Sequence, residues 1–200
     1  MTSGIAVFLV GVVVYGVILN MREVTLQKAM LDKGYRILKN PNIVIDRKSF
    51  QLSLYEDTVL IKSYRVSFGK NINEKKNRAN DYATPVGEYQ ICSVDTLHQY
   101  HKFLRLNYPN LDDASEVLRL GLITQKEFDD LRFQYYYGGC TDYNEVLGGN
   151  IGIHGIGRLN YIFKNLPFVY NWTDGSVAMS NENIDEIFSI TGVGTKVVIK

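Results

Sequence analysis

Apolar and polar residues alternate with a period of two over much of the chain after residue 43. Phe50, Leu52 and Leu54 alternate with polar neighbours, a polar turn follows at 55–58, and a second such run covers 59–68. A period of two separated by a short turn predicts a β-hairpin. Further strands are expected at 88–94, 104–106, 150–154 and 194–200.

Helical spacing appears at Leu26, Met30 and Leu31, where a short polar helix or stalk is expected over 23–40, and again between the later strands. A short helix is expected to begin at Asp112 or Asp113 and to stop at Gly121. A capping box, Thr124–Glu127, opens the next helix, because the hydroxyl and the carboxylate can each accept a backbone N–H of the first turn. Ser180 is the expected cap of the last helix. The pattern predicts a mainly β fold, a sandwich or barrel-like core with a few inserted helices.

The first 22 residues follow neither pattern. Ile5–Leu19 carries no charge, and with its uncharged neighbours the run reaches the ~20 residues that a membrane-spanning helix needs. No small-x-small cleavage signal precedes Arg22, which favours an uncleaved transmembrane helix over a signal peptide; a buried core helix is the alternative. We therefore interpret 1–22 as a membrane anchor, 23–42 as a polar stalk and 43–200 as the folded domain.

Composition and charge narrow the functional classes. Two hundred residues with 46% hydrophobic content suit one globular domain with an appendage. The net charge of +1 gives no basic field for nucleic acid, so no nucleic-acid partner is expected. Two cysteines, Cys92 and Cys140, are too few for a disulfide framework, and either one bridge or two free thiols fits.

Two stretches carry candidate chemistry. His154 ends a β run and is followed by Gly155, a position where an imidazole can act as a base, although a structural histidine fits as well. His98 and His101 are interpreted as surface residues. Ser176 ends a loop just before a helix, which suits a nucleophile, although it could also be an ordinary serine near a helix.

Taken in order, several motifs resemble the YkuD-type L,D-transpeptidase catalytic domain. They are TPVGEY at 84–89, GGNIGIHG at 148–155, WTDGS at 172–176, the helix after Ser180 and the strand from Gly194. The resemblance covers about 43–200. It implies acyl transfer on peptidoglycan stem peptides: a nucleophile attacks the carbonyl of the third residue, D-alanine leaves, and an amine resolves the acyl-enzyme.

The resemblance also implies site residues and a location. It assigns no metal and no cofactor, and it leaves the oligomeric state open. It implies a membrane-anchored domain facing the periplasm or the cell wall, which conflicts with the basic residues that follow the apolar run, because the positive-inside rule would place the domain in the cytoplasm. The resemblance implies that Ser176 stands at the nucleophile position and that His154 is the base. The carbonyl of Gly155 would orient the imidazole, and the backbone at Gly175 would bind the oxyanion. The residues implied to contact the substrate are Trp172, Thr173 and Asp174.

One departure from the family pattern bears on activity. The family nucleophile is cysteine, and this chain has Ser176, whose hydroxyl is far less ionised than a thiol. Three interpretations stay open: an engineered Cys-to-Ser variant, a natural pseudoenzyme that binds wall peptides as a scaffold, and a slow serine nucleophile. Migration of the nucleophile to Cys140 is a further alternative. Asp174 and Ala178 match a variant subgroup of the family.

Overall fold

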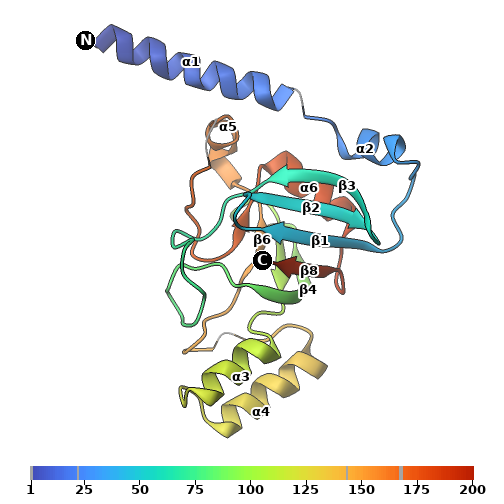
Figure 1. Cartoon of the computed structure of the whole chain (residues 1–200), viewed down its shortest axis with the longest axis vertical. Helices are drawn as coiled ribbons and strands as arrows, with labels where there is room; N and C mark the ends of the chain where they lie inside the picture. The colour runs from blue at the N-terminus through green and yellow to red at the C-terminus, as the bar shows by residue number, and fades with distance from the viewer. Residues whose placement is uncertain (1, 22, 143, 167–168) are drawn as a thin grey trace.

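The computed structural model describes residues 2–21, 23–142, 144–166 and 169–200 (Figure 1). Its strands are β1 (Pro41–Asp46), β2 (Gln51–Glu56), β3 (Val59–Arg65), β4 (Gly87–Asp95), β5 (Phe103–Leu106), β6 (Gly152–His154), β7 (Val177–Ala178) and β8 (Lys196–Ile199). Its helices are α1 (Thr2–Met21), α2 (Leu26–Asp32), α3 (Leu111–Arg119), α4 (Gln125–Phe133), α5 (Asn160–Phe163) and α6 (Asn181–Ile190). A π-helical turn, η1 (Gln134–Gly138), and a 3₁₀ turn, η2 (Gly157–Leu159), complete the helical segments.

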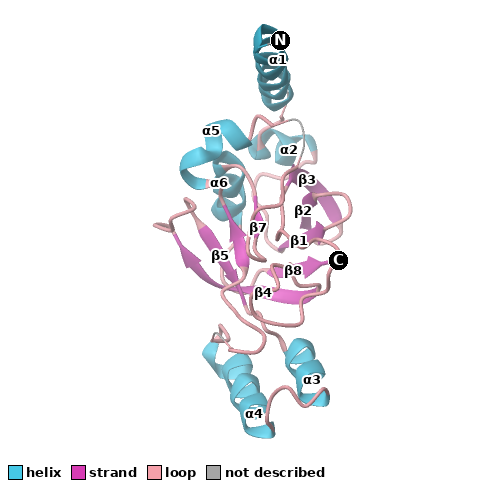
Figure 2. Ribbon diagram, turned by 90° about the vertical axis from the view of Figure 1, so that its left-hand side faces the viewer, coloured by secondary structure: helices cyan, strands magenta, loops and turns pink. Residues whose placement is uncertain are grey.

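The described strands form one mixed sheet of eight strands in the order β3-β2-β1-β8-β4-β5-β6-β7. Parallel pairing joins β1 to β8 and β6 to β7, and the other neighbours are antiparallel. The sheet curls into a half-barrel (Figure 2), and an isolated bridge from Ser67 to Ala178 brings the segment after β3 onto the β7 edge. The two edges of the sheet therefore meet beside residue 176.

The alternating pattern predicted the buried face of the hairpin correctly. Leu52 and Leu54 of β2 are fully buried, and β3 pairs with β2 in antiparallel register. They join a main core that includes Ile184 and Ile187 of α6. α2, within the segment interpreted as a polar stalk, buries Leu26 and Met30 in that same core.

The strands form a single curled mixed sheet, a half-barrel with helices at both of its ends, so the core has the barrel-like rather than the sandwich form of the prediction (Figures 1 and 2). The predicted transmembrane helix is wrong. α1 is helical, but within the described ranges no helix has the combination of length and apolar character that crossing a bilayer requires. In α1, Gly16 is buried and lies against the backbone of Asn165.

α3, α4 and η1 form a helical insertion between β5 and β6, at the end of the sheet away from α1 (Figure 1). The predicted capping box of Thr124 and Glu127 is present. α3 begins at Leu111, slightly earlier than expected: Asn110 is its cap, and Asp113 sits at the third helical position of a second capping box.

The helical insertion has a small core of its own. Ala114, Val117, Ile123, Leu131 and Leu147 are buried together there. A disulfide from Cys92 of β4 to Cys140, just after η1, ties the helical insertion to the sheet. The free-thiol alternative is therefore excluded, and Cys140 has no thiol with which to act as a nucleophile.

Candidate active site

A cleft of about 500 Å³ lies where β6 and the loop before β7 meet. It is lined by His154, Trp172, Thr173, Asp174 and Ser176, five of the seven predicted site residues. The other two lie beside them: the carbonyl of Gly155 contacts the imidazole of His154, and Gly175, within the loop, packs closely against Ala83. Residues separated by up to 22 positions in the sequence therefore share one cavity.

His154 is the last residue of β6, and it is 3% exposed. Its Nδ1 lies 2.6 Å from the carbonyl oxygen of Gly155. Because a carbonyl can only accept, Nδ1 carries the proton, and Nε2 keeps its lone pair. Burial lowers the pKa of His154 to about 4, the Gly155 carbonyl opposes this shift, and His98 adds to it. The imidazole is therefore neutral at pH 7, the form that a base requires.

The loop that carries Ser176 is fixed by backbone hydrogen bonds to the segment after β3. Ser67 and Ala178 exchange two bonds of 2.8 Å. Thr173 donates its N–H to Phe68 at 3.2 Å and accepts from the amide of Lys70 at 3.0 Å. These bonds hold both ends of the loop against a segment more than a hundred positions earlier in the sequence.

Thr173 and Gly175 set the shape of the loop from within. The buried Thr173 hydroxyl donates to the carbonyl of Ser176 at 2.6 Å and accepts from the amide of Gly175 at 3.3 Å. Gly175 has φ +130°, and a Cβ there would lie 2.8 Å from the carbonyl oxygen of Ala83. Glycine is required because an L side chain disfavours this conformation and the space is filled.

Ser176 is in the cleft but is not bonded to His154. Its Oγ accepts the backbone N–H of Gly152 at 3.2 Å, and within the described residues no hydrogen bond joins this hydroxyl to the imidazole. The predicted oxyanion donor at Gly175 has its amide directed to Thr173. Both predicted catalytic groups thus already hold hydrogen-bond partners, Ser176 on β6 and Gly175 within the loop.

Charged side chains also line the cleft. Asp174, whose side chain is 75% exposed, pairs with Lys70 at 2.8 Å. Lys76 is buried and pairs with Asp81 at 2.8 Å, and this lysine also lines the cleft. Desolvation raises the pKa of Asp81, but hydrogen bonds from Lys76 and three backbone amides outweigh it and lower the pKa overall. These contacts explain why the charged loop at 69–81 folds against the site.

The sequence interpretation missed several residues that line the cleft. His98 and Tyr100 both line it, although His98 had been predicted to lie at the surface. His101, predicted likewise, pairs with Asp185 of α6 at 2.9 Å. Two histidines flanking a tyrosine, in a chain with only three histidines, were the available signal.

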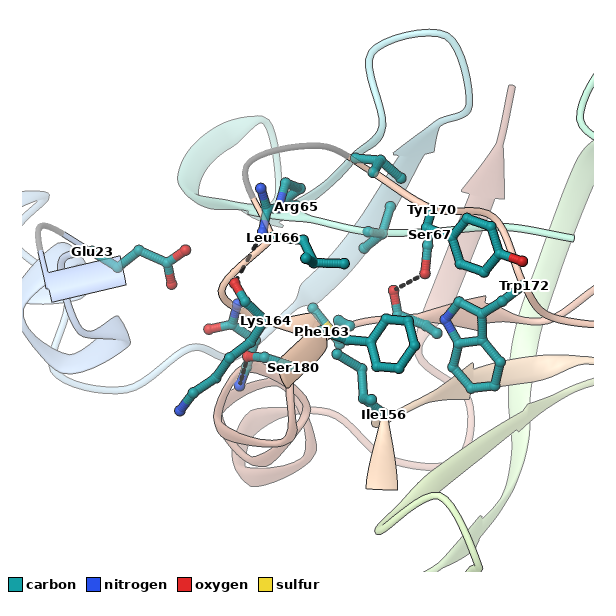
Figure 3. Close-up of a pocket in the computed structure, with 15 residues that line it drawn as sticks. Glu23, Arg65, Ser67, Ile156, Phe163, Lys164, Leu166, Tyr170, Trp172 and Ser180 are labelled. Atoms are coloured by element: carbon teal, nitrogen blue, oxygen red, sulfur yellow. Dashed lines mark hydrogen bonds between the residues drawn. The ribbon is translucent and has the colours of Figure 1, made fainter. Parts of the chain in front are cut away.

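Behind Trp172 lies a second cavity, of about 60 Å³, shown in Figure 3. Phe163, Leu166 and Tyr170 line it, and Trp172 lines both cavities. The described residues that line it include no histidine and no cysteine, so they supply neither an imidazole base nor a thiol nucleophile. In the described part of the chain, no cluster of three or more His, Cys, Asp or Glu residues could hold a metal ion.

Comparison with known proteins identifies the family of this fold. The family profile of the L,D-transpeptidase catalytic domain, YkuD, matches residues 40–199. Comparison with curated proteins gives no match. Similar solved structures include the helical cell shape determining protein Pgp2 from Campylobacter jejuni, at 16% identity and a TM-score of 0.51, with 88% of this chain and 55% of that one covered.

Two L,D-transpeptidase structures are also similar. That from Xylanimonas cellulosilytica has 18% identity and a TM-score of 0.46, with 86% of this chain and 68% of that one covered. That from Mycobacterium smegmatis has 13% identity and a TM-score of 0.46, with 80% and 58% covered. The chain thus spans little more than half the length of Pgp2. The profile covers nearly the whole folded domain, and the chain belongs to the YkuD family of L,D-transpeptidase catalytic domains.

Proposed function

We propose that the His154 cleft carries out L,D-transpeptidase acyl transfer on peptidoglycan stem peptides, slowed by serine at the nucleophile position. The observation that supports this most is the hydrogen bond of 2.6 Å between Nδ1 of His154 and the Gly155 carbonyl, in the cavity that also holds Ser176. It leaves Nε2 able to accept the nucleophile's proton. The side chain at 176 then attacks the carbonyl of the stem peptide, and the proton passes to the leaving D-alanine.

The environment of His154 explains why serine would be slow. A base works best when its pKa is near the working pH, and burial lowers the pKa of His154 to about 4. Such an imidazole is a poor acceptor for an alcohol proton. A thiol ionises near pH 8.5, and backbone amides before α6 would favour its thiolate further. Substituting cysteine should therefore restore activity that serine cannot support.

A second function, binding of wall peptides without turnover, is favoured by one observation. The Ser176 hydroxyl accepts from Gly152 and has no bond to His154, so it is not prepared for attack. A family fold with this arrangement would keep the peptide cleft and act as a scaffold. For either function we place the domain on the wall-facing side of the membrane, where the Cys92–Cys140 disulfide would persist.

The deciding experiment is release of D-alanine from a disaccharide tetrapeptide. We expect Ser176→Cys to release D-alanine at least about 100-fold faster than the parent chain, and His154→Ala in the cysteine background to remove that gain. Calorimetric binding of the same muropeptide to the parent chain runs alongside. A folded Ser176→Cys variant that is as inert as the parent, while the parent still binds muropeptide, would establish the scaffold instead.

A further inference from the structure

The segment Leu97–Lys102, here called the Tyr100 loop, joins β4 to β5 and packs on His154. The ring of Tyr100 lies 4.8 Å from the imidazole, centroid to centroid, at an interplanar angle of 24°. Trp172 closes the arrangement edge-on, with its centroid 5.3 Å from Tyr100 and 5.6 Å from His154. Tyr100 therefore stacks on the imidazole, and Trp172 packs edge-on against it.

The Tyr100 loop packs so closely against the backbone after His154 that a side chain at position 155 or 157 would collide with it. A Cβ at Gly155 would lie 2.7 Å from the carbonyl oxygen of Tyr100, and one at Gly157 would lie 3.0 Å from that of Gln99. The amide of Gly155 donates to the carbonyl of Lys102 at 3.3 Å. The two glycines after His154 thus admit the loop that carries Tyr100.

A contact with α6 holds the Tyr100 loop in a strained shape. His101 has φ +80°, a left-handed conformation that is uncommon and strained for a residue other than glycine. Its Nε2 lies 2.9 Å from Oδ1 of Asp185, and Lys102 pairs with the same oxygen at 2.6 Å. Burial raises the pKa of Asp185, but the contacts with Lys102 and His101 outweigh it and lower the pKa. Asp185 therefore keeps its charge and the contact.

The orientation of the imidazole needs such support. The torsion between Cβ and a histidine ring is broad, so the rotamer alone does not fix which way Nδ1 points. Rotation of the ring would break its bond to the Gly155 carbonyl and would also unstack it from Tyr100. The stacking on Tyr100 and the hydrogen bond to Gly155 thus favour the same orientation of the imidazole ring.

We propose that Tyr100 is a positioning residue for His154, and that the Asp185 contact of His101 holds Tyr100 in place. The ring of Tyr100 excludes water from one face of the imidazole and keeps its Nδ1 on the Gly155 carbonyl. This inference rests on the proposed role of His154 as the base. The titratable groups whose rings face the imidazole are Tyr100, which stacks on it, and His98, whose tilted ring lies 6.3 Å away. Lys70, Lys76 and Asp174 line the same cleft.

The test is an NMR titration of the histidine ring nitrogens in the parent chain, which needs no substrate and no turnover. With the parent near 4, we expect Tyr100→Ala to raise the pKa of His154 by one unit or more towards 6.5, because water reaches the exposed face. Tyr100→Phe keeps the ring and should leave the pKa unchanged. Tyr137→Ala, at a tyrosine 78% exposed on the helical insertion, is the matched control and should also change nothing.

Asp185→Asn separates positioning from simple electrostatics and remains informative if Tyr100→Ala fails to fold. Loss of a negative charge alone would lower the pKa of His154, whereas release of the Tyr100 loop should raise it. A rise supports the proposal, and a fall or no change overturns the role of the contact. An unchanged pKa in folded Tyr100→Ala, or a shift of equal size in Tyr100→Phe, overturns the stacking role. In the Ser176→Cys background, Tyr100→Ala should lower kcat at least about 10-fold while Tyr100→Phe does not.

Discussion

Helix α4 of the helical insertion begins at a capping box whose partners are three positions apart, whereas the Ser176 loop is held by Ser67, 111 positions from Ala178. The helical insertion has its own buried cluster, a second capping box and a disulfide. The cleft has backbone bonds between distant segments and aromatic rings around one imidazole. The helical insertion is stabilised by contacts between residues near in sequence and by a disulfide, whereas the cleft forms only when the whole sheet has curled. Variants in the helical insertion and variants in the cleft should therefore differ in their effects on stability and on His154.

The largest effect is expected from breaking the disulfide. Cys92→Ser with Cys140→Ser opens a loop of 48 residues, and the chain-entropy estimate for such a loop is about 4 kcal/mol of unfolding free energy. Urea denaturation of oxidised and doubly substituted protein measures it. The His154 titration should be unchanged at low urea, because the cleft does not contact the bridge. A double variant whose His154 titrates near 6.5 would show that the two regions are not independent.

Acid should act on the two regions in opposite directions. The pKa of His154 is lowered to about 4 by burial, so the unfolded chain binds a proton more readily, and stability is lost as pH falls from 6.5 towards 4. The pKa of Asp113 in α3 is raised to about 6 by burial, so its contribution is present at low pH and is lost as pH rises through 6. Between pH 7.5 and 4.5 each contributes about 2–3 kcal/mol, and the two nearly offset.

Single variants separate these two contributions. Asp113→Asn should lose about 2 kcal/mol more stability than the parent on acidification from pH 7.5 to 4.5, whereas His154→Gln should lose about 2–3 kcal/mol less. Denaturant unfolding at both pH values is the measurement. If the parent and both variants lost the same stability on acidification, burial could not be the cause of the pKa shifts of His154 and Asp113.

Within the cleft, Thr173 joins the two ends of the Ser176 loop. Thr173→Val keeps the shape and removes both hydroxyl bonds, leaving the buried carbonyl of Ser176 without this donor, at a cost of about 1–3 kcal/mol. Thermal unfolding measures the cost, and muropeptide affinity should fall with it. Thr141→Val is a matched control and should be nearly neutral, since the buried Thr141 hydroxyl has no hydrogen-bond partner among the residues that the structure describes. Equal losses in the two variants would argue against a special role for Thr173.

The smallest effect is expected at the cap of α4. Thr124→Ala removes the side-chain acceptor of the Glu127 amide and should cost about 1 kcal/mol. Hydrogen exchange of α4 should quicken while β6 and β7 stay protected. Faster exchange in β6 as well would mean that the helical insertion supports the cleft.

The same contrast explains what could be predicted from the sequence. The capping box at Thr124 could be predicted because its two partners are three positions apart. The hairpin of β2 and β3 could be predicted because its adjacent strands show the alternating apolar pattern. β7, only two residues long, and the bridge of Ser67 to Ala178 were not, since a two-residue strand has no period to detect. The Ser180 cap was predicted from the same kind of local signal.

For the site, the ordered motifs identified the residues of the cleft but not their partners. His154 and Ser176 line one cavity as predicted from motif order, but the bond of Ser176 to Gly152 depends on how β6 and β7 pair. Tyr100 was missed because its neighbours His98 and His101 look like surface residues when only their polar surroundings are considered. The predicted transmembrane helix was wrong because an uncharged run in the sequence is a necessary condition for spanning and not a sufficient one.

The central claim is that residue 176 is the acyl-accepting position and His154 its base. Intact-protein mass spectrometry after incubation with a carbapenem tests it most directly, on the parent, Ser176→Cys, and Ser176→Cys with His154→Ala. We predict a stoichiometric adduct on residue 176 in the cysteine variant, little or none in the parent, and strongly slowed labelling when His154 is removed. Folded Ser176→Cys protein that stays unlabelled, or an adduct that peptide mapping places elsewhere, would contradict the account.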